Sequence, residues 1–290
     1  MMKLLITGCD GQVGTELTRQ SRALGWTVKA VDRDGLDITD LEAVNNAVCV
    51  FKPDAVVNAA AYTAVDKAER DRDAAFAVNR DGPKNLAVVC SDLDIPLIHY
   101  STDYVFDGSK SDAYAENDPV APLGVYGESK LAGEQAVCEL CSKYLILRTS
   151  WVFSAHGSNF VKTMLRLGAE RKELGVVADQ FGKPTSAAEL ARVTLEIISS
   201  VDIRWGIYHL AQPLVTSWYG FAEAIFEEAR RQAVALKLEQ LNTIATSDYP
   251  TFAKRPANSE LHCDKLESIF GASIKPWRQS LVEVIREMKD

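Results

Sequence analysis

The sequence predicts an α/β protein built on a doubly wound parallel sheet, and three observations carry this prediction. In the first 150 residues, short apolar runs alternate with longer amphipathic stretches, which is typical of βαβ units. The apolar runs are continuous, as expected for strands covered by helices on both faces. Three glycines, Gly8, Gly11 and Gly14, follow the first run, where a strand turns into a helix.

The elements follow in order along the chain. Strands are expected at 3–7, 27–32, 54–60, 96–102 and 144–151, with helices from Gln12, from Thr39, over 74–93 and over 126–143. Beyond Trp151 the pattern is less regular, with helices expected near 158–172, 187–200, 217–236 and 279–289 and short strands near 174–177 and 207–210. The irregular segment 247–261 is expected to lie over a cleft. We place a domain boundary near residue 150, so that 1–150 form the first domain and 151–290 a smaller α/β domain with segments free to return to the first sheet.

Composition excludes several classes of protein. The formal net charge of −8 argues against a nucleic-acid partner, which would select a basic face. No apolar run approaches the roughly 20 residues that span a bilayer. The opening MMKLLITG leaves no room for a secretory segment, so a cytoplasmic protein is expected. The six cysteines and four histidines show no metal-ligand spacing, and the C-x-x-C at Cys138 and Cys141 lies in a helical pattern.

The three glycines predict a dinucleotide site. Gly8 permits a tight turn, Gly11 lets the backbone approach a pyrophosphate, and Gly14 lets the helix pack against the strand. The helix that starts at Gln12 and Val13 presents free N–H groups to the phosphates. The spacing, G-x-x-G-x-x-G, differs from the commonest fingerprint, but its strand–turn–helix context is the required one.

The residues around this loop leave the choice between NADH and NADPH open. Asp32 ends the second strand about 20 residues beyond the glycines, where an acid accepts hydrogen bonds from the adenosine ribose of NAD. Arg33 follows at once and could hold the 2′-phosphate of NADP instead. Further contacts with the cofactor are expected from Asp37 and Ile38, which would border the adenine, and from the stretch after the third strand, Ala60, Ala61, Tyr62 and Thr63.

A second group of residues predicts proton transfer. Thr102 and Asp103 end the fourth strand, and the carboxyl ends of such strands bind ligands. Tyr126 and Lys130 are one helical turn apart in VYGESKLAGE. Free tyrosine has a pKa of about 10, and a nearby ammonium favours its phenolate. Lys130 could also bond the nicotinamide ribose, while Thr102 donates to the substrate carbonyl.

Together these motifs resemble the extended short-chain dehydrogenase/reductase superfamily. More narrowly, NAAAYTAVDKAE, YSTDYVFDG, VYGESKLAGE, LRTSWVF, NFVKTML, DQFGKPT and RPANSEL are similar to the dTDP-4-dehydrorhamnose reductase family over nearly the whole chain. The resemblance implies a Rossmann-type domain followed by a mainly substrate-binding domain. It also implies that NADPH or NADH reduces the 4-keto group of dTDP-4-dehydro-L-rhamnose to give dTDP-L-rhamnose.

The resemblance also implies roles for particular residues. Tyr126 would be the proton donor, Lys130 would orient the ribose and tune the tyrosine, and Thr102 and Asp103 would contact the sugar. Substrate contacts are further implied for Trp151, Asn159, Lys162 and Arg255. Some members use Mg²⁺ at a homodimer interface through glutamates at places comparable with Glu16 and Glu189, so a possible metal ion and homodimer are expected with them.

Alternatives remain on the same scaffold. Dehydratases of the superfamily carry Thr-Asp-Glu, whereas Tyr104 follows Thr102 and Asp103 here, which weakens that reading. Another sugar-nucleotide reductase or an epimerase is excluded less firmly. A non-catalytic NAD(P)-binding regulatory subunit, like that of methionine adenosyltransferase, is the alternative from another class. The exact sugar and the nucleotide base stay open.

Overall fold

The central sheet has six parallel strands, and its strand order reverses beside β1. The computed structural model describes residues 1–289. The strands β1 (Lys3–Thr7), β2 (Thr27–Val31), β3 (Ala55–Asn58), β4 (Leu97–Thr102), β5 (Tyr144–Thr149) and β10 (Gly206–His209) lie in the order β10-β5-β4-β3-β1-β2. The five strands expected in the first half are confirmed, with ends within two residues. Since β1 is flanked by β2 and β3, loops leaving β1 and β3 diverge there and open a crevice, which is where sheets of this class bind ligands.

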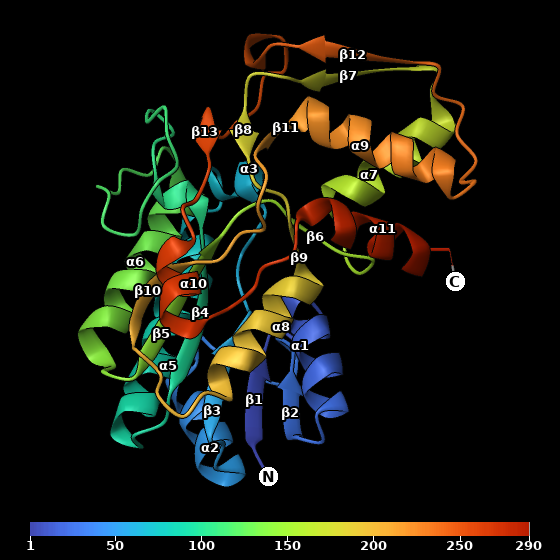
Figure 1. Cartoon of the computed structure of the whole chain (residues 1–290). Helices are drawn as coiled ribbons and strands as arrows, with labels where there is room; N and C mark the ends of the chain where they lie inside the picture. The colour runs from blue at the N-terminus through green and yellow to red at the C-terminus, as the bar shows by residue number, and fades with distance from the viewer. Residues whose placement is uncertain (290) are drawn as a thin grey trace.

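Helices cover both faces of this sheet, as the continuous apolar strands predict (Figure 1). Leu4 and Ile6 of β1 join one core with Leu17 of α1 (Gln12–Ala23) and Leu190 of α8 (Ala187–Ile198). Leu5 points to the opposite face, where its core includes residues of α2 (Leu41–Phe51), α5 (Gly82–Asp92) and α6 (Val125–Leu140). The α/β doubly wound class is therefore confirmed.

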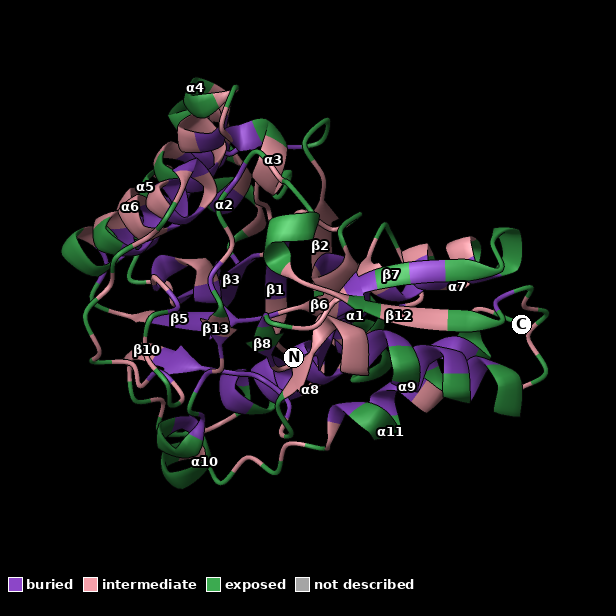
Figure 2. Ribbon diagram, turned by 90° about the horizontal axis from the view of Figure 1, so that it is seen from above, coloured by how far each residue is buried: buried purple, intermediate pink, exposed green. Residues whose placement is uncertain are grey.

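The second half of the chain adds one strand and one helix to the central sheet and its helical covering, and it also forms a core of its own. Both α8 and β10 come from beyond residue 150, and β10 pairs with β5 as the last strand of the sheet. A separate core lies among α7 (Phe160–Glu170), α9 (Trp218–Arg231) and α11 (Trp277–Glu287). It includes Phe221 of α9 and Trp277 of α11. A parallel pair, β7 (Glu173–Val177) and β12 (Gln240–Ile244), lies over these helices (Figure 1). Seen from above, this unit extends to one side of the central sheet (Figure 2).

Several elements differ from the sequence expectation. The single helix expected over 74–93 is instead α4 (Arg72–Phe76), a π-helical turn (Ala77–Asp81) and α5. Pro83 in the first turn of α5 has no N–H for a regular i−4 hydrogen bond, which favours this widened turn. The helix expected from Thr39 begins at Leu41, because the Asp40 side chain accepts hydrogen bonds from two N–H groups of its first turn.

The remaining short elements connect the two halves. They are α3 (Val65–Ala68), a 3₁₀ turn at Asp103–Val105, β6 (Val152–Phe153), β8 (Phe181–Gly182), β9 (Thr185–Ser186), β11 (Thr216–Ser217), a 3₁₀ turn at Thr246–Asp248, β13 (Asn258–Ser259) and α10 (Asp264–Phe270). Strands of two residues are too short to show a hydrophobic period, so the sequence did not reveal them. No helix within residues 1–289 is both long and apolar enough to cross a membrane.

Candidate active site

The glycine loop has the geometry of a phosphate-binding turn. Gly8 has φ of +71°, a left-handed conformation that favours glycine. A Cβ atom on Gly14 would lie 2.1 Å from the Gly8 carbonyl oxygen, so only glycine allows α1 to start this close to β1. Gly11 is the N-cap of α1 and provides no side-chain cap, which leaves the first N–H groups of the helix open to an anion.

A cavity of about 430 Å³ lies where the ends of β1 and β3 diverge. It is lined by nine of the residues expected to bind the cofactor: Gly8, Gly11, Asp32, Arg33, Asp37, Ile38, Ala60, Ala61 and Tyr62. Gln12, Val13 and Gly14 follow as the first turn of α1, and Thr63 is exposed outside the lining. A dinucleotide needs an elongated cleft that ends at a helix N-terminus, and these residues fit that requirement.

The far end of this cleft carries both acids and an arginine. Asp32 Oδ1 accepts a hydrogen bond from the Gly35 N–H at 2.9 Å, which lowers the pKa of Asp32. Asp37 accepts from the Thr39 N–H at 2.9 Å, and this bond likewise lowers its pKa. Both carboxylates are therefore ionised at neutral pH, with the exposed Arg33 beside them.

Thr102 and Asp103 lie at the carboxyl end of β4, in the middle of the sheet. The Thr102 hydroxyl donates a hydrogen bond to Asp103 Oδ1 at 3.0 Å and accepts one from the Tyr104 N–H at 3.2 Å. Asp103 Oδ2 has no hydrogen-bond partner within residues 1–289. Burial raises the pKa of Asp103 to about 6. The site therefore contains a buried carboxyl group with an unused acceptor.

Tyr126 lies in the first turn of α6 and contacts this pair. Its ring packs edge-on against Tyr104, with 5.5 Å between ring centroids. Burial raises the pKa of Tyr126 to about 12; the nearby Asp103 charge adds to the effect, and a hydrogen bond with Thr102 opposes it. The phenol therefore holds its proton at neutral pH.

Lys130 does not act on Tyr126 in this structure as the sequence predicted. Its Nζ donates to the Tyr100 carbonyl oxygen at 2.6 Å and lies 3.4 Å from His99 Nε2. Burial lowers the pKa of Lys130 to about 8. Burial of Tyr126 opposes the expected shift towards the phenolate, and the Lys130 amino group is directed to β4.

The expected substrate residues divide into two groups. Trp151 has φ of +49° and stacks on Trp218 with ring centroids 3.6 Å apart. Trp218 and Arg255 line a second cavity, of about 440 Å³, together with Tyr249. The segment expected to lie over a cleft thus supplies three residues of a cavity wall, Tyr249, Thr251 and Arg255.

Arg255 meets the first half of the chain across this cavity. Its Nη2 lies 2.9 Å from Asp66 Oδ2, and its buried Nε has no partner within the described chain. The backbone N–H of Ala253 also donates to Asp66 Oδ1, at 3.1 Å. The 247–261 segment is therefore tied to α3.

The other two expected substrate residues have different contacts. The Asn159 side chain donates to Gln12 Oε1 at 3.0 Å and caps α7 by accepting from the Lys162 N–H at 3.1 Å. Lys162 is exposed, and its Nζ donates to the Ala155 carbonyl oxygen at 3.1 Å. Neither residue lines the 440 Å³ cavity. Asn159 instead fastens the glycine-loop helix to the second half of the chain.

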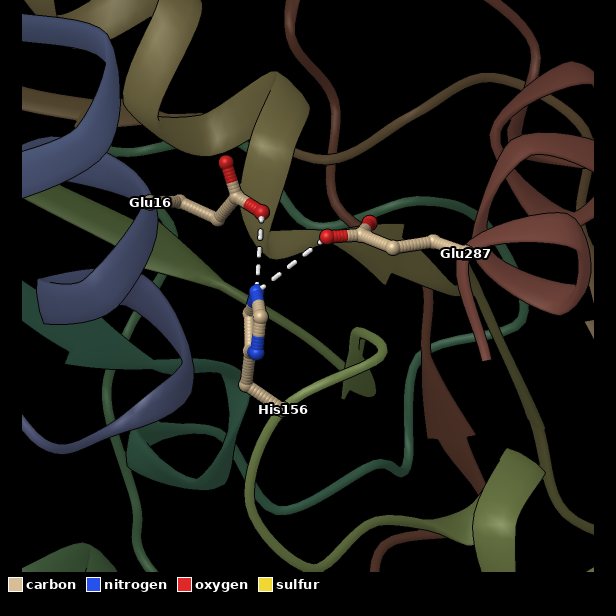
Figure 3. Close-up of side chains that lie close together, drawn as sticks. All are labelled: Glu16, His156 and Glu287. Carbon is tan, nitrogen blue, oxygen red and sulfur yellow. Dashed lines mark ion pairs between the residues drawn. The ribbon is translucent and has the colours of Figure 1, made fainter. Parts of the chain in front are cut away.

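The magnesium candidates Glu16 and Glu189 each form an ion pair with an arginine of their own helix. Glu189 Oε1 lies 2.6 Å from Arg192 Nη2, and Glu16 Oε2 lies 2.6 Å from Arg19 Nη2. The group of potential ligands around Glu16 contains His156 and Glu287 rather than Glu189, within the described residues (Figure 3). Mg²⁺ prefers oxygen ligands only, so this set with an imidazole fits it poorly, and we derive no step through a metal.

Two buried polar residues beside the site were not singled out from the sequence. Asn58 ends β3 and His99 lies within β4, and both are almost fully inaccessible. The available signal was chemical: a histidine and an asparagine stood inside otherwise apolar strand runs. Such residues are buried only when their hydrogen bonds are satisfied, which points to a specific network.

Comparisons with known proteins agree with this geometry. Residues 2–290 match the family model described as RmlD substrate binding domain. A dTDP-4-dehydrorhamnose reductase from Aggregatibacter actinomycetemcomitans is 45% identical over 98% of each chain. A crystal structure of a dTDP-4-dehydrorhamnose reductase from Clostridium acetobutylicum is 40% identical, covers 100% of both chains and has a TM-score of 0.94.

A third relative connects the family to a cofactor. The dTDP-4-dehydrorhamnose reductase of Bacillus anthracis, solved in complex with NADP, is 37% identical over 99% of each chain with a TM-score of 0.92. These matches run from end to end, as the motifs do, and confirm the resemblance that those motifs indicate. The chain belongs to the dTDP-4-dehydrorhamnose reductase family.

Proposed function

We propose that the protein uses NADPH or NADH to reduce the 4-keto group of dTDP-4-dehydro-L-rhamnose, giving dTDP-L-rhamnose. The observation that carries the proposal is the grouping of Thr102, Asp103 and Tyr126 at the carboxyl end of β4, next to a cleft that starts at the glycine loop. A reductase of this kind needs a proton donor beside a cofactor cleft, and this grouping supports that assignment.

Tyr126, Thr102 and the bound cofactor have separate roles in the reduction. Bound NAD(P)H supplies the hydride that the carbonyl carbon accepts. Tyr126 donates its phenolic proton to the carbonyl oxygen as that oxygen becomes an alkoxide, and solvent restores the proton afterwards. Because burial keeps Tyr126 protonated at neutral pH, it suits the acid role in the direction of reduction. Thr102 orients the same oxygen by a hydrogen bond.

The residues of the cleft support cofactor binding without selecting one dinucleotide. The N–H groups of the first turn of α1 would bind the diphosphate, Lys130 would hold the nicotinamide ribose, and the small Ala60 and Ala61 would let the cofactor approach the backbone. Asp32 favours the ribose diol of NADH, whereas Arg33 is available to the 2′-phosphate of NADPH. We therefore propose that both cofactors are used.

The nucleotide part of the substrate is assigned to the 440 Å³ cavity. Trp218 and Tyr249 offer aromatic surfaces for the base, and Arg255 offers a planar fork of donors for the diphosphate. Trp151, stacked on Trp218, lies between this cavity and β5 and would contact the sugar. In this proposal Arg255 exchanges Asp66 for the diphosphate when the substrate binds.

The test follows the absorbance of NADPH and of NADH, separately, while a dehydratase and a 3,5-epimerase generate the substrate. Oxidation that requires the epimerase and yields dTDP-L-rhamnose supports the proposal, and the rate ratio gives the cofactor preference. Tyr126→Phe should abolish turnover and leave cofactor binding nearly unchanged. Tyr104→Phe is the matched control, since it removes a neighbouring buried phenol and should retain turnover. Full activity of Tyr126→Phe would exclude the mechanism.

Other outcomes identify the alternatives. Cofactor binding without oxidation would favour a regulatory subunit or a different sugar nucleotide. Product formed without net cofactor oxidation would indicate an epimerase. The homodimer and the cytoplasmic location stay predictions, which light scattering of the pure protein and cell fractionation would test.

A further inference from the structure

A buried chain of polar side chains runs behind Lys130, across the ends of three strands. Thr7 Oγ1 donates to Asn58 Oδ1 at 2.8 Å, Asn58 Nδ2 lies 3.0 Å from His99 Nδ1, and His99 Nε2 lies 3.4 Å from Lys130 Nζ. Each of these four residues is at most 2% exposed. Water therefore has little access to the chain, and its own atoms decide where each proton lies.

The backbone fixes the direction of these hydrogen bonds. The N–H of Ala60 donates to Asn58 Oδ1 at 3.1 Å, and since an N–H can only donate, this atom is the amide oxygen. The amide nitrogen of Asn58 therefore faces His99. Because an amide nitrogen does not accept hydrogen bonds, His99 Nδ1 must be the acceptor. Neutral His99 consequently carries its proton on Nε2, the nitrogen that faces Lys130.

An N–H group at this position opposes the ammonium form of Lys130. A neutral amine can accept from His99 Nε2–H while it donates to the Tyr100 carbonyl oxygen 2.6 Å away. An ammonium has donors only, so two donors would face each other across 3.4 Å. Protonation of His99 gives no relief, because Nδ1 would then oppose the amide N–H of Asn58.

The charged groups around Lys130 and His99 do not remove this preference for the neutral amine of Lys130. Glu134, on the same helix, is the carboxylate that acts on Lys130, and both its oxygens already accept from Arg148, at 2.9 Å and 2.7 Å. Tyr126, also on this helix, is an uncharged phenol at neutral pH. Burial holds the pKa of His99 well below its usual range, so His99 itself stays neutral.

We propose that His99, fixed by Asn58 with its proton on Nε2, is a positioning residue that favours the uncharged amine of Lys130 in the cofactor-free protein, and that binding of NAD(P)H draws a proton from solvent onto Lys130 Nζ. The inference rests on the proposed function, in which Lys130 meets the nicotinamide ribose. Ribose hydroxyls offer acceptors and the diphosphate offers negative charge, and both favour the ammonium.

Isothermal titration of the wild-type protein with NADH tests this proton uptake directly. The heat is measured at pH 8.5 in buffers of different ionisation enthalpy, and its slope gives the number of protons taken up. With a Lys130 pKa of about 8, roughly three quarters of a proton is expected at pH 8.5 and almost none at pH 6.5. Binding at pH 8.5 without uptake would overturn the inference alone. No binding at either pH would instead overturn the proposed function.

Two substitutions test whether the tautomer of His99, and no other feature, causes the proton uptake. Asn58→Asp replaces the amide N–H with a carboxylate oxygen, so the His99 proton moves to Nδ1 and Nε2 becomes an acceptor for the ammonium. Proton uptake at pH 8.5 should then fall at least threefold. Thr7→Val is the matched control, because the Ala60 N–H still fixes the Asn58 amide and uptake should stay at the wild-type value.

Nitrogen chemical shifts report the tautomer without any cofactor. In protein labelled with ¹⁵N-histidine, His99 should show a protonated Nε2 and an unprotonated Nδ1 in the wild type and in Thr7→Val. In Asn58→Asp, Nδ1 should instead be protonated and Nε2 unprotonated. A wild-type His99 with its proton on Nδ1 would overturn the inference, whether or not the Asn58 variant folds.

Discussion

Replacement of Gly14 by alanine is expected to weaken both the fold and cofactor binding. The new Cβ would lie 2.1 Å from the Gly8 carbonyl oxygen and 2.8 Å from Cys9 Cα, and both are backbone atoms that cannot rotate away. Real Cβ contacts essentially never fall below 3.0 Å, so the start of α1 must move by 3.0 − 2.1 = 0.9 Å from the turn after β1. That movement displaces the N–H groups that face the cofactor phosphates.

The magnitude follows from these two consequences. Overpacking of this kind costs about 1–3 kcal/mol of unfolding free energy, and each kcal/mol lowers Tm by about 2–4 °C in a large domain. Losing one charge-assisted hydrogen bond to the phosphates costs about 1.5–3 kcal/mol, which is roughly a 10- to 150-fold increase in Kd. Urea unfolding without cofactor and fluorescence titration with NADPH measure the two effects separately.

Gly11→Ala is the matched control, because it should lose cofactor affinity alone. Its Cβ would meet only the Gly8 carbonyl oxygen, at 3.3 Å, and its φ of −74° suits alanine. The free energy of unfolding should change by less than about 0.5 kcal/mol. The Kd for NADPH should rise, since Gly11 lines the cleft. Wild-type stability and wild-type affinity in Gly14→Ala would refute the reasoning, and so would equal destabilisation of both variants.

Two further predictions concern the substrate side. The pKa of Asp103 is raised from 3.8 to about 6 by burial, so the folded protein binds more protons than the unfolded chain between these values, and stability falls by about 2 kcal/mol as pH rises from 4 to 6. Asp103→Asn should therefore be more stable than wild type by about that amount at pH 7.5 but not at pH 4, as measured by urea unfolding; an equal difference at both pH values would contradict this. Arg255→Met should raise KM for the sugar nucleotide about 10- to 150-fold with a smaller effect on kcat, whereas Asp66→Asn, which removes the partner of Arg255, should leave KM unchanged or lower. Equal KM increases in both variants would argue against an exchange of partners at Arg255.

The sequence predicts local features of this fold well, because their causes are local. Continuous apolar runs bounded by turn residues favour strands buried on both faces, and Gly8 and Gly14 answer steric needs that the structure displays. The grouping of Thr102 with Tyr126 was also predictable. Thr102 ends β4, and Tyr126 starts the next α-helix along the chain, so both are expected at the carboxyl edge of the sheet.

Contacts that depend on distant segments were not predictable from a single sequence. Asp66 and Arg255 meet across 189 positions, and Gln12 meets Asn159 across 147. Neither pair leaves a pattern in its own neighbourhood, so the sequence did not indicate either contact. The same limit applies to Lys130, whose carbonyl partner at Tyr100 depends on how deeply α6 packs against β4.

The buried polar residues in β4 and directly after it are better explained by function than by stability of the fold. His99, Ser101 and Thr102 of β4, and Asp103 directly after it, are polar or ionisable, and all are buried. A strand selected for stability alone would carry aliphatic residues here, as its neighbour β3 does at its first three positions. Two of these side chains also leave polar atoms without partners in the described chain, Ser101 Oγ and Asp103 Oδ2. Such orphaned groups destabilise a resting protein, so their position beside a proton donor favours a role in holding a polar ligand.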